Sequence, residues 1–196
     1  MPHRANKFVT LWQMSVSIRN IELLAPAKDY LSAVDAIDCG ADAVYIGAGR
    51  FGARYAATNS VEDIAKVVDY AHRFGVKVYA TLNTIIFDSE IEDAKSQAEA
   101  LVAVGVDALI IQDLKLLDYG LPPIRMHAST QCDNRTSEQI LHLQQLGFRR
   151  AVLARELSLE QITEIHQTTQ HYTILHNTTP CYTILNDISF GCLPSS

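Results

Sequence analysis

Short apolar runs alternate with amphipathic stretches along most of this chain. The runs are continuous rather than alternating, which is typical of parallel strands buried on both faces. The stretches between them carry apolar residues at helical spacing, and most end at glycine. The predicted strands are Ile21–Leu24, Ala43–Ile46, Val76–Ala80, Ala108–Ile111, Ile124–Met126 and Ala151–Ala154. The pattern therefore predicts about six consecutive βα units.

The predicted helices carry clear start signals. Ser60 and Asp63 form one capping pair, and Ser158 and Gln161 form another. The helices are expected at Lys28–Cys39, from Ser60 to just before Gly75, and at Ser89–Val104, Asp113–Tyr119, Ser137–Leu146 and Ser158–His166. Two further short strands are expected at Tyr172–Leu175 and Tyr182–Leu185, with no helix after either.

Two α/β architectures accept such a run: a doubly wound open sheet and a (β/α)8 TIM-like barrel. Polar residues follow all six runs rather than one switch point, which favours the barrel. A barrel needs eight units and about 250 residues, so the 196 residues predict an incomplete barrel with an open edge. The expected domains are a leader over residues 1–20, a partial catalytic barrel over 21–167, and a divergent tail over 168–196.

Charge and hydropathy narrow the function classes. A net charge of −6 argues against a surface that coats nucleic acid generally, although a local basic cleft stays open. No apolar run reaches the roughly 18–20 residues that cross a bilayer. The apolar stretch Phe8–Met14 lacks a small-residue cleavage site after it. These features predict a cytoplasmic protein with no membrane insertion.

Candidate chemistry gathers where the strands end, because the carboxyl ends of parallel strands share the ligand-binding face. The sharpest cluster is His127, Ser129, Thr130 and Gln131, which could orient a substrate or relay a proton. Its alternative role is a hydrogen-bonded cap of the loop. Ser129 has no acid partner in sequence that would complete a hydrolase triad.

The segment Gly47–Gly52 matches GxGxxG but follows the second strand rather than the first, and no helix begins directly after it. It fits a turn that needs glycine, or a substrate loop in which Arg50 and Arg54 grip a carboxylate or phosphate. Asn83 and Arg155 are further substrate-binding candidates, and Glu156 is a catalytic one. Arg155 and Glu156 are expected to point inward as a pair, or to form a structural ion pair.

The four cysteines are Cys39, Cys132, Cys181 and Cys192. They are widely spread and form no CxxC pair, which predicts reduced thiols. An iron–sulfur cluster normally takes four thiolates, which here would have to converge from distant parts of the chain.

Five short sequence motifs, in the order in which they occur along the chain, resemble motifs of the collagenase-like peptidase family U-32. The resemblance covers about residues 21–166. The motifs are Glu22-Leu-Leu-Ala-Pro-Ala27, Ala41-Asp-Ala-Val-Tyr-Ile-Gly47, Phe51-Gly-Ala-Arg54, His127-Ala-Ser-Thr-Gln131 and Leu153-Ala-Arg-Glu-Leu-Ser158. The resemblance implies a TIM-barrel-like catalytic domain and a protease label. It also implies a link to hydroxylation of transfer RNA, ribosomal RNA or the ubiquinone ring. Such members use prephenate as the oxygen source and a four-iron cluster held by four cysteines.

The family's cysteines begin in a stretch resembling His-Gly-Ala-Leu-Cys, where this chain has His176-Asn-Thr-Thr-Pro-Cys181. Only Cys181 aligns with a family ligand, so the resemblance implies a cluster in full-length members and none in this chain. The departure also predicts a truncated or frame-shifted tail. We expect a full-length enzyme that binds a small anion such as prephenate and acts on RNA or ubiquinone. The alternatives are a peptidase, and an inactive or partner-dependent fragment that self-associates through its open edge.

Overall fold

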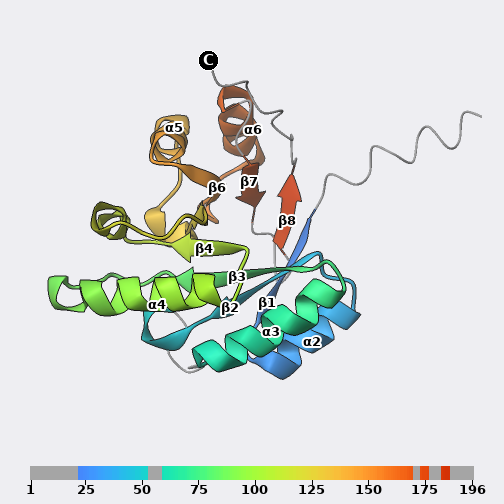
Figure 1. Ribbon diagram of the computed structural model, residues 1–196. Coiled ribbons are helices and arrows are strands. Elements are labelled where there is room, and N and C mark those ends of the chain that lie inside the picture. Colours follow the sequence, from blue (N-terminus) through green and yellow to red (C-terminus); the bar gives the residue numbers. More distant parts are fainter. Residues whose placement is uncertain (1–21, 53–58, 170–172, 177–181, 186–196) are drawn as a thin grey trace, which may run out of the picture.

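A ring of short strands forms the centre of the computed structural model (Figure 1). The structure describes residues 22–52, 59–169, 173–176 and 182–185, with side chains for 22–52 and 59–169. The strands are β1 Leu23–Ala27, β2 Ala43–Gly47, β3 Lys77–Leu82, β4 Ala108–Ile111, β5 Arg125–Ala128, β6 Phe148–Val152, β7 Thr173–His176 and β8 Tyr182–Leu185. Their order around the closed barrel follows the sequence.

The strand pairing confirms a TIM-like barrel built from six βα units. Strands β1 to β7 pair with their neighbours in parallel. Strand β8 is antiparallel to both β7 and β1. Residues 177–181 and 186–196, which follow β7 and β8, lie outside the described residues, so the absence of a helix after either strand stays a prediction. The six units confirm the expected incomplete (β/α)8 barrel. The expectation of an open edge was wrong, because β8 pairs with β1 and closes the ring of strands. The predicted self-association was argued from an open edge, which the closed ring does not provide.

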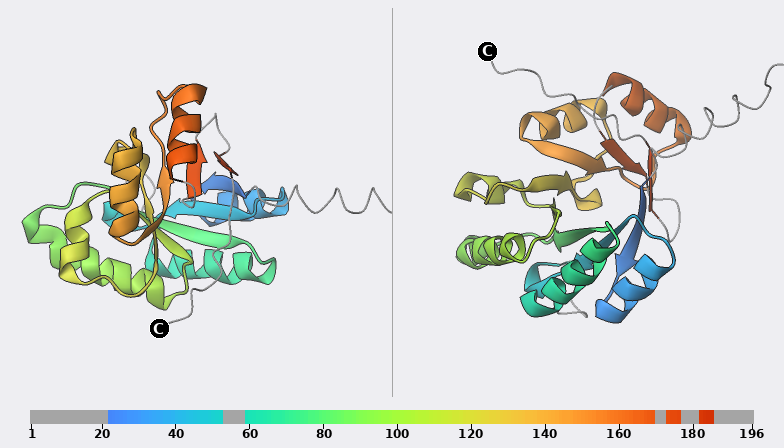
Figure 2. Two further views of the ribbon diagram at one scale, coloured as in Figure 1. Left: turned by 90° about the horizontal axis from the view of Figure 1, so that it is seen from above. Right: turned by 45° about the vertical axis from the view of Figure 1, so that its right-hand side comes forward.

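The helices lie outside the ring of strands, as Figures 1 and 2 show. They are α2 Tyr30–Asp38, α3 Val61–Arg73, α4 Ile91–Ala103, α5 Ser137–Gln145 and α6 Leu159–Thr168, with the short 3-10 helices η2 Gly49–Phe51, η3 Asp88–Glu90, η4 Leu114–Tyr119 and η5 Thr130–Cys132. Both predicted capping boxes are present, at Ser60 and at Ser158. The predicted fourth helix is the 3-10 helix η4, which ends at Gly120 in a left-handed conformation.

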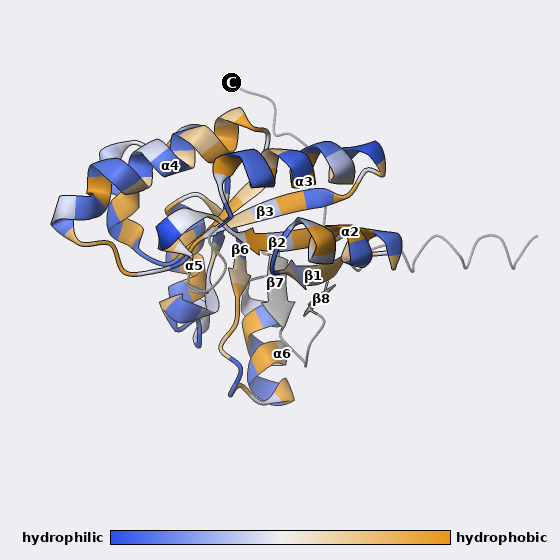
Figure 3. Ribbon diagram, turned by 90° about the horizontal axis from the view of Figure 1, so that it is seen from below, coloured by the Kyte–Doolittle hydropathy of each residue, from blue (hydrophilic) through white to orange (hydrophobic). Residues whose placement is uncertain are grey.

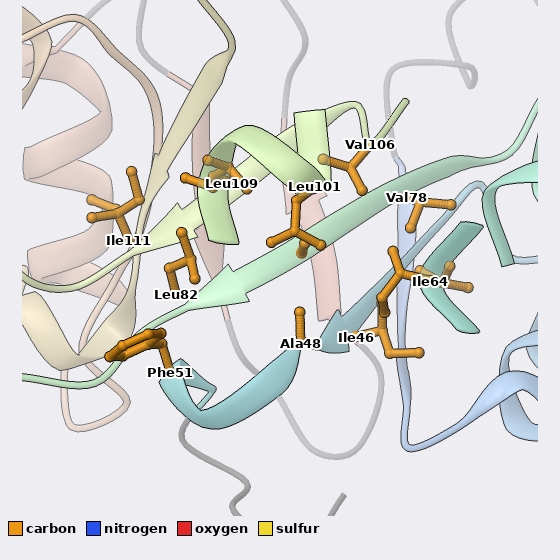
Figure 4. Packing of buried hydrophobic residues seen from close by; sticks show 14 of the residues in the cluster. Ile46, Ala48, Phe51, Ile64, Val78, Leu82, Leu101, Val106, Leu109 and Ile111 are labelled. Carbon is orange, nitrogen blue, oxygen red and sulfur yellow. The ribbon is translucent and has the colours of Figure 1, made fainter. Parts of the chain in front are cut away.

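Two apolar layers follow from the alternation of side chains along each strand. The larger layer lies between the strands and the helices, where Leu101 of α4 and Ile64 of α3 contact side chains of β2 and β3 (Figure 4). Helices α3 and α4 carry hydrophilic residues as well as hydrophobic ones (Figure 3). The smaller layer comprises Leu24, Ala43, Tyr79, Ala108, Ile110 and Val152. It fills the inside of the ring.

The strands are offset from the predicted runs by a few residues, and one offset moves a candidate residue. Strand β5 is Arg125–Ala128 rather than Ile124–Met126, so His127 lies inside the strand and not after it. Strand β6 begins at Phe148 and therefore includes Arg150. Within the described residues, none of the helices has both the length and the apolar character that a bilayer crossing requires.

Candidate functional site

A pocket that opens to solvent lies at the carboxyl ends of the strands. Five strands each place one side chain in it. These are Leu24 from β1, Tyr45 from β2, Thr81 from β3, Ile110 from β4 and Val152 from β6. Asn83, Ser129 and Thr130 complete the lining from the segments that follow β3 and β5. The pocket therefore occupies the face at which barrel enzymes bind their substrates.

The segment after β5 is held in place by backbone and side-chain hydrogen bonds. The Ser129 amide donates to the carbonyl of Ile111 at 2.8 Å, which extends the ladder between β4 and β5. The Ser129 hydroxyl accepts from the amide of Gln131 at 3.3 Å. The buried Asn134 amide donates to the carbonyls of Ser129 at 2.9 Å and Val152 at 2.7 Å. These bonds join β4, β5 and β6 at the rim of the pocket.

The predicted site residues divide between three locations. Asn83, Ser129 and Thr130 line the pocket, so the structure brings these three together. Gln131 is exposed outside it. His127 lies on β5, two residues before Ser129. Its side chain is buried inside the barrel and does not line the pocket.

His127 is only 2% exposed, and its Nδ1 atom has no hydrogen-bond partner among the described residues. Its ring meets the Tyr79 ring edge-on, with 4.7 Å between centroids. Burial, together with the positive charge of Arg150, lowers the pKa of His127 to about 3. The imidazole is therefore neutral at physiological pH. It serves as a packed member of the interior rather than as a base that faces the pocket.

A buried ionic cluster inside the barrel is the feature that sequence reasoning missed. Arg150 donates to both carboxylate oxygens of Glu22, at 2.6 Å and 3.2 Å, and to the Tyr79 hydroxyl at 3.0 Å. The Tyr79 hydroxyl and Lys77 each donate to Glu22 at 2.7 Å. Burial opposes ionisation of Glu22, but the hydrogen bonds and charge of Arg150, with Lys77 and Tyr79, lower its pKa to about 2. The available signal was the pair Arg149 and Arg150 next to the apolar residues of β6, since only one of two neighbouring strand residues can face outward.

The two predicted anion-binding arginines that the structure describes, Arg50 and Arg155, are both exposed. Arg50 donates to Asp93 at 2.9 Å and also approaches Glu90 at 3.5 Å. Arg155 and Glu156 are both exposed, which corrects the expected inward pair. Glu156 instead accepts from Arg135 at 3.2 Å. Arg54 lies outside the described residues.

The glycine-rich segment forms a tight turn after β2. Gly49 has a φ of +51°, and a Cβ atom there would lie 2.5 Å from Oε1 of Gln97. The Gln97 side chain donates to the carbonyl of Ala48 at 2.7 Å, and the Gly49 amide donates to the carbonyl of Asn59 at 3.0 Å. Glycine is therefore needed for the turn itself, in agreement with the structural interpretation of this motif.

The described cysteines do not fit a shared metal site. Cys39 is exposed and caps the end of α2, on the face opposite the pocket. Cys132 donates to the carbonyls of Ile111 and Gln112, both at 3.4 Å. Burial raises the pKa of the Cys132 thiol to about 11. In residues 22–52 and 59–169, no three His, Cys, Asp or Glu side chains lie close enough to hold a metal ion. Cys181 and Cys192 lie outside the described residues.

Comparison with known proteins identifies relatives of this barrel. Over 156 residues the chain is 54% identical to the 23S rRNA 5-hydroxycytidine C2501 synthase of Escherichia coli, covering 80% of this chain and 24% of that protein. Over 155 residues it is 36% identical to the tRNA hydroxylation protein P of Helicobacter pylori, covering 76% of this chain and 36% of that protein. The chain thus spans about a quarter to a third of the length of these relatives.

A solved structure of a U32 peptidase has the same fold. The two superpose with a TM-score of 0.63 at 16% sequence identity, over 77% of this chain and 66% of the other. Residues 28–176 match the model of peptidase family U32, which is most of the chain. This match agrees with the five sequence motifs and with the shared barrel architecture. The chain therefore belongs to peptidase family U32.

Proposed function

We propose that this chain is the barrel part of an enzyme that hydroxylates RNA. The observation that carries the proposal is the 54% identity to the E. coli 23S rRNA 5-hydroxycytidine synthase over 80% of this chain. The tRNA hydroxylation protein of H. pylori gives it independent support. The chain spans 24% of the E. coli enzyme, so the proposed activity is that of the longer relative, to which this barrel would contribute. Because the names of these relatives refer to ribosomal and transfer RNA, we also propose a cytoplasmic location.

The geometry of the strand ends suits a two-substrate reaction of this kind. The open pocket would take one substrate between Asn83, Ser129 and Thr130. The exposed Arg155 after β6, with Arg50 at the outer rim, would attract a small anion such as prephenate. Arg54 is proposed as a third such group from its position in the sequence.

An iron–sulfur cluster is part of the full-length family chemistry that the sequence resemblance implies. The described residues do not fit one, because Cys39 and Cys132 lie at opposite ends of the barrel and Cys132 is a protonated, hydrogen-bonded thiol. We therefore derive no step through a cluster. If a cluster operates in the complete enzyme, its ligands come from outside these residues, with Cys181 as the candidate in this chain.

A peptidase activity is the competing function, supported by the family name. Its chemistry needs an activated nucleophile within hydrogen-bond reach of a base. In the described residues the Ser129 hydroxyl accepts from the Gln131 amide, while the neutral His127 lies inside the barrel with its Nδ1 atom unpartnered. This arrangement does not build a serine–histidine pair, so we favour RNA hydroxylation.

A domain replacement tests the proposal. Residues 22–169 of this chain would replace the matching segment of the E. coli 23S rRNA 5-hydroxycytidine synthase, in cells that lack that enzyme. The proposal predicts that 5-hydroxycytidine returns to the 23S rRNA. A chimaera that accumulates as folded protein, cleaves gelatin and leaves the rRNA unmodified would establish the peptidase function instead.

A further inference from the structure

Four polar side chains form one layer inside the ring of strands, where a TIM barrel usually carries branched apolar residues. All four are buried. The hydroxyl of Tyr79 on β3 donates to Glu22 at 2.7 Å and accepts from Arg150 at 3.0 Å. The ring of Tyr79 lies edge-on to the ring of His127, and His127 of β5 is the register partner of Arg150 of β6. We call Glu22, Tyr79, His127 and Arg150 the polar layer.

Stability alone does not account for the polar layer. The buried ion pair of Glu22 and Arg150 costs the desolvation of both charges, and apolar side chains of similar volume often stabilise a fold as well or better. The Nδ1 atom of His127, which has no partner among the described residues, adds a further cost. Costly interior groups are expected mainly at functional sites, where a defined geometry matters more than stability. The composition of the polar layer therefore points to a role in a neighbouring site.

The polar layer lies next to the strand-end pocket along the strands. Each of its members precedes a pocket-lining residue by two positions in the chain. Alternate residues of a strand point to the same face, and two residues advance the chain by about 7 Å. The polar layer is therefore one step away from the pocket lining, toward the amino ends of the strands. The four pairs are Glu22 with Leu24, Tyr79 with Thr81, His127 with Ser129, and Arg150 with Val152.

The contacts of the polar layer join strands that are not neighbours in the sheet. Backbone hydrogen bonds fix each strand only against the strands on either side of it. The ion pair of Glu22 and Arg150 joins the start of β1 to β6, and the hydroxyl of Tyr79 joins β3 to both. We propose that the polar layer positions the walls of the pocket, by fixing the distances across the ring between the strands that carry them. Its members act through the wall residues that follow them and are therefore positioning residues.

Tyr79→Phe is the sharpest variant for a test. It removes only the hydroxyl that contacts both charges, and it keeps the ring against His127. The ion pair stays in place, so this variant is expected to fold. The double variant Glu22→Gln with Arg150→Met removes both charges and loosens the layer further. Ile140→Val is the matched control, because it deletes one buried methylene from the outer apolar layer on α5 at a similarly small cost in stability.

Methyl relaxation NMR on the 196-residue chain tests the positioning without any ligand. Leu24, Thr81 and Val152 each carry methyl groups in the pocket lining. Tyr79→Phe, and more strongly the double variant, are expected to lower the order parameters of these methyl groups, whereas Ile140→Val leaves them as ordered as in the parent chain. Pocket methyl groups that stay fully ordered in Tyr79→Phe overturn the inference, and this variant decides the question even if the double variant fails to fold. An equal loss of order in Ile140→Val also overturns it, because the layer would then act only through overall stability.

For catalysis the inference rests on the proposed function, and the domain replacement tests that part. At limiting expression, Tyr79→Phe should lower the fraction of 5-hydroxycytidine per folded chimaera about tenfold, because small displacements in a reacting site are costly. Ile140→Val should leave that fraction unchanged. Equal hydroxylation by the Tyr79→Phe and parent chimaeras refutes the positioning role and leaves RNA hydroxylation standing. A folded parent chimaera without any hydroxylation refutes the proposed function, and the methyl order parameters then still decide the positioning role.

Discussion

Glu22 and Arg150 form a two-pronged ion pair inside the barrel, although 128 positions separate them in the sequence. Glu22 directly precedes β1, and Arg150 lies within β6. Lys77 of β3 also contacts Glu22. The ion pair and Lys77 thus connect the start of β1 to β3 and β6. Their side chains are only 9% and 8% exposed, so the loss of either partner leaves a buried charge.

Glu22→Gln is expected to destabilise the fold by about 3–5 kcal/mol, because Arg150 keeps its charge without a counter-ion. The double variant Glu22→Gln with Arg150→Met removes both charges and should recover a large part of that loss. Urea unfolding of the two single variants and the double variant measures the coupling. If the loss of unfolding free energy in the double variant equals the sum of the losses in the two single variants, the two residues are not coupled and the account is contradicted.

Acidification should destabilise the barrel through His127. The pKa of His127 is lowered to about 3 in the folded chain, against about 6.5 when unfolded. The unfolded state therefore binds the proton first, and stability is lost as the pH falls from about 6.5 toward 3. The loss approaches about 1.4 kcal/mol per pH unit for one such group.

His127→Phe keeps an aromatic ring against Tyr79 and cannot titrate. Unfolding free energies measured at neutral pH and at about pH 5 should then differ less in this variant than in the parent chain. His142→Phe is a surface control that should retain the parent's pH dependence, because His142 is exposed on α5. An identical pH dependence in the His127 variant and the parent would show that His127 is not the group responsible.

Gly49→Ala should cost more stability than Gly120→Ala, although both glycines have positive φ. At Gly120 nothing lies within 4 Å of the added Cβ, so only backbone strain of about 1–2 kcal/mol applies. At Gly49 the Cβ displaces Gln97 and breaks its hydrogen bond to Ala48, which adds about 1 kcal/mol. In a Gln97→Ala background, the additional loss of stability caused by Gly49→Ala should largely disappear. Thermal unfolding of the four variants measures this, and an excess that persists would place the strain in another contact.

Arg155→Ala should weaken prephenate binding about tenfold, and the remaining binding should be less sensitive to salt. Arg50→Ala should have a smaller effect, because Asp93 already neutralises that guanidinium. Arg73→Ala is the control, since Arg73 lies at the end of α3 on the opposite face of the barrel. Calorimetric titration at two salt concentrations gives the comparison. Equal affinities for the parent chain and the Arg155 variant would remove Arg155 from the site.

The helices and the order of the units could be predicted because their signals are local. The capping boxes at Ser60 and Ser158 form as their residue types require. The inner cluster could not be predicted in the same way. Which alternate side chains of a strand face inward depends on register, and β5 and β6 are displaced from their apolar runs. That displacement put His127 inside the barrel and left Arg150 unnoticed.

Only part of the pocket lining could be predicted from the sequence. Ser129, Thr130 and Asn83 directly follow or lie close to strand ends, so the rule that ligands bind there found them. Tyr45 and Thr81 lie within their strands and look like ordinary strand residues in the sequence. Only the closure of the ring shows that they face the same space.

The nucleosides of 23S rRNA from cells that carry the chimaera give the most direct measurement of the central claim. Cells that lack the E. coli synthase provide the background, and mass spectrometry of digested rRNA gives the fraction of 5-hydroxycytidine. RNA hydroxylation by this barrel predicts that the modified nucleoside returns with the chimaera. A chimaera present at the level of the native enzyme, folded, and without any 5-hydroxycytidine in the rRNA would contradict it.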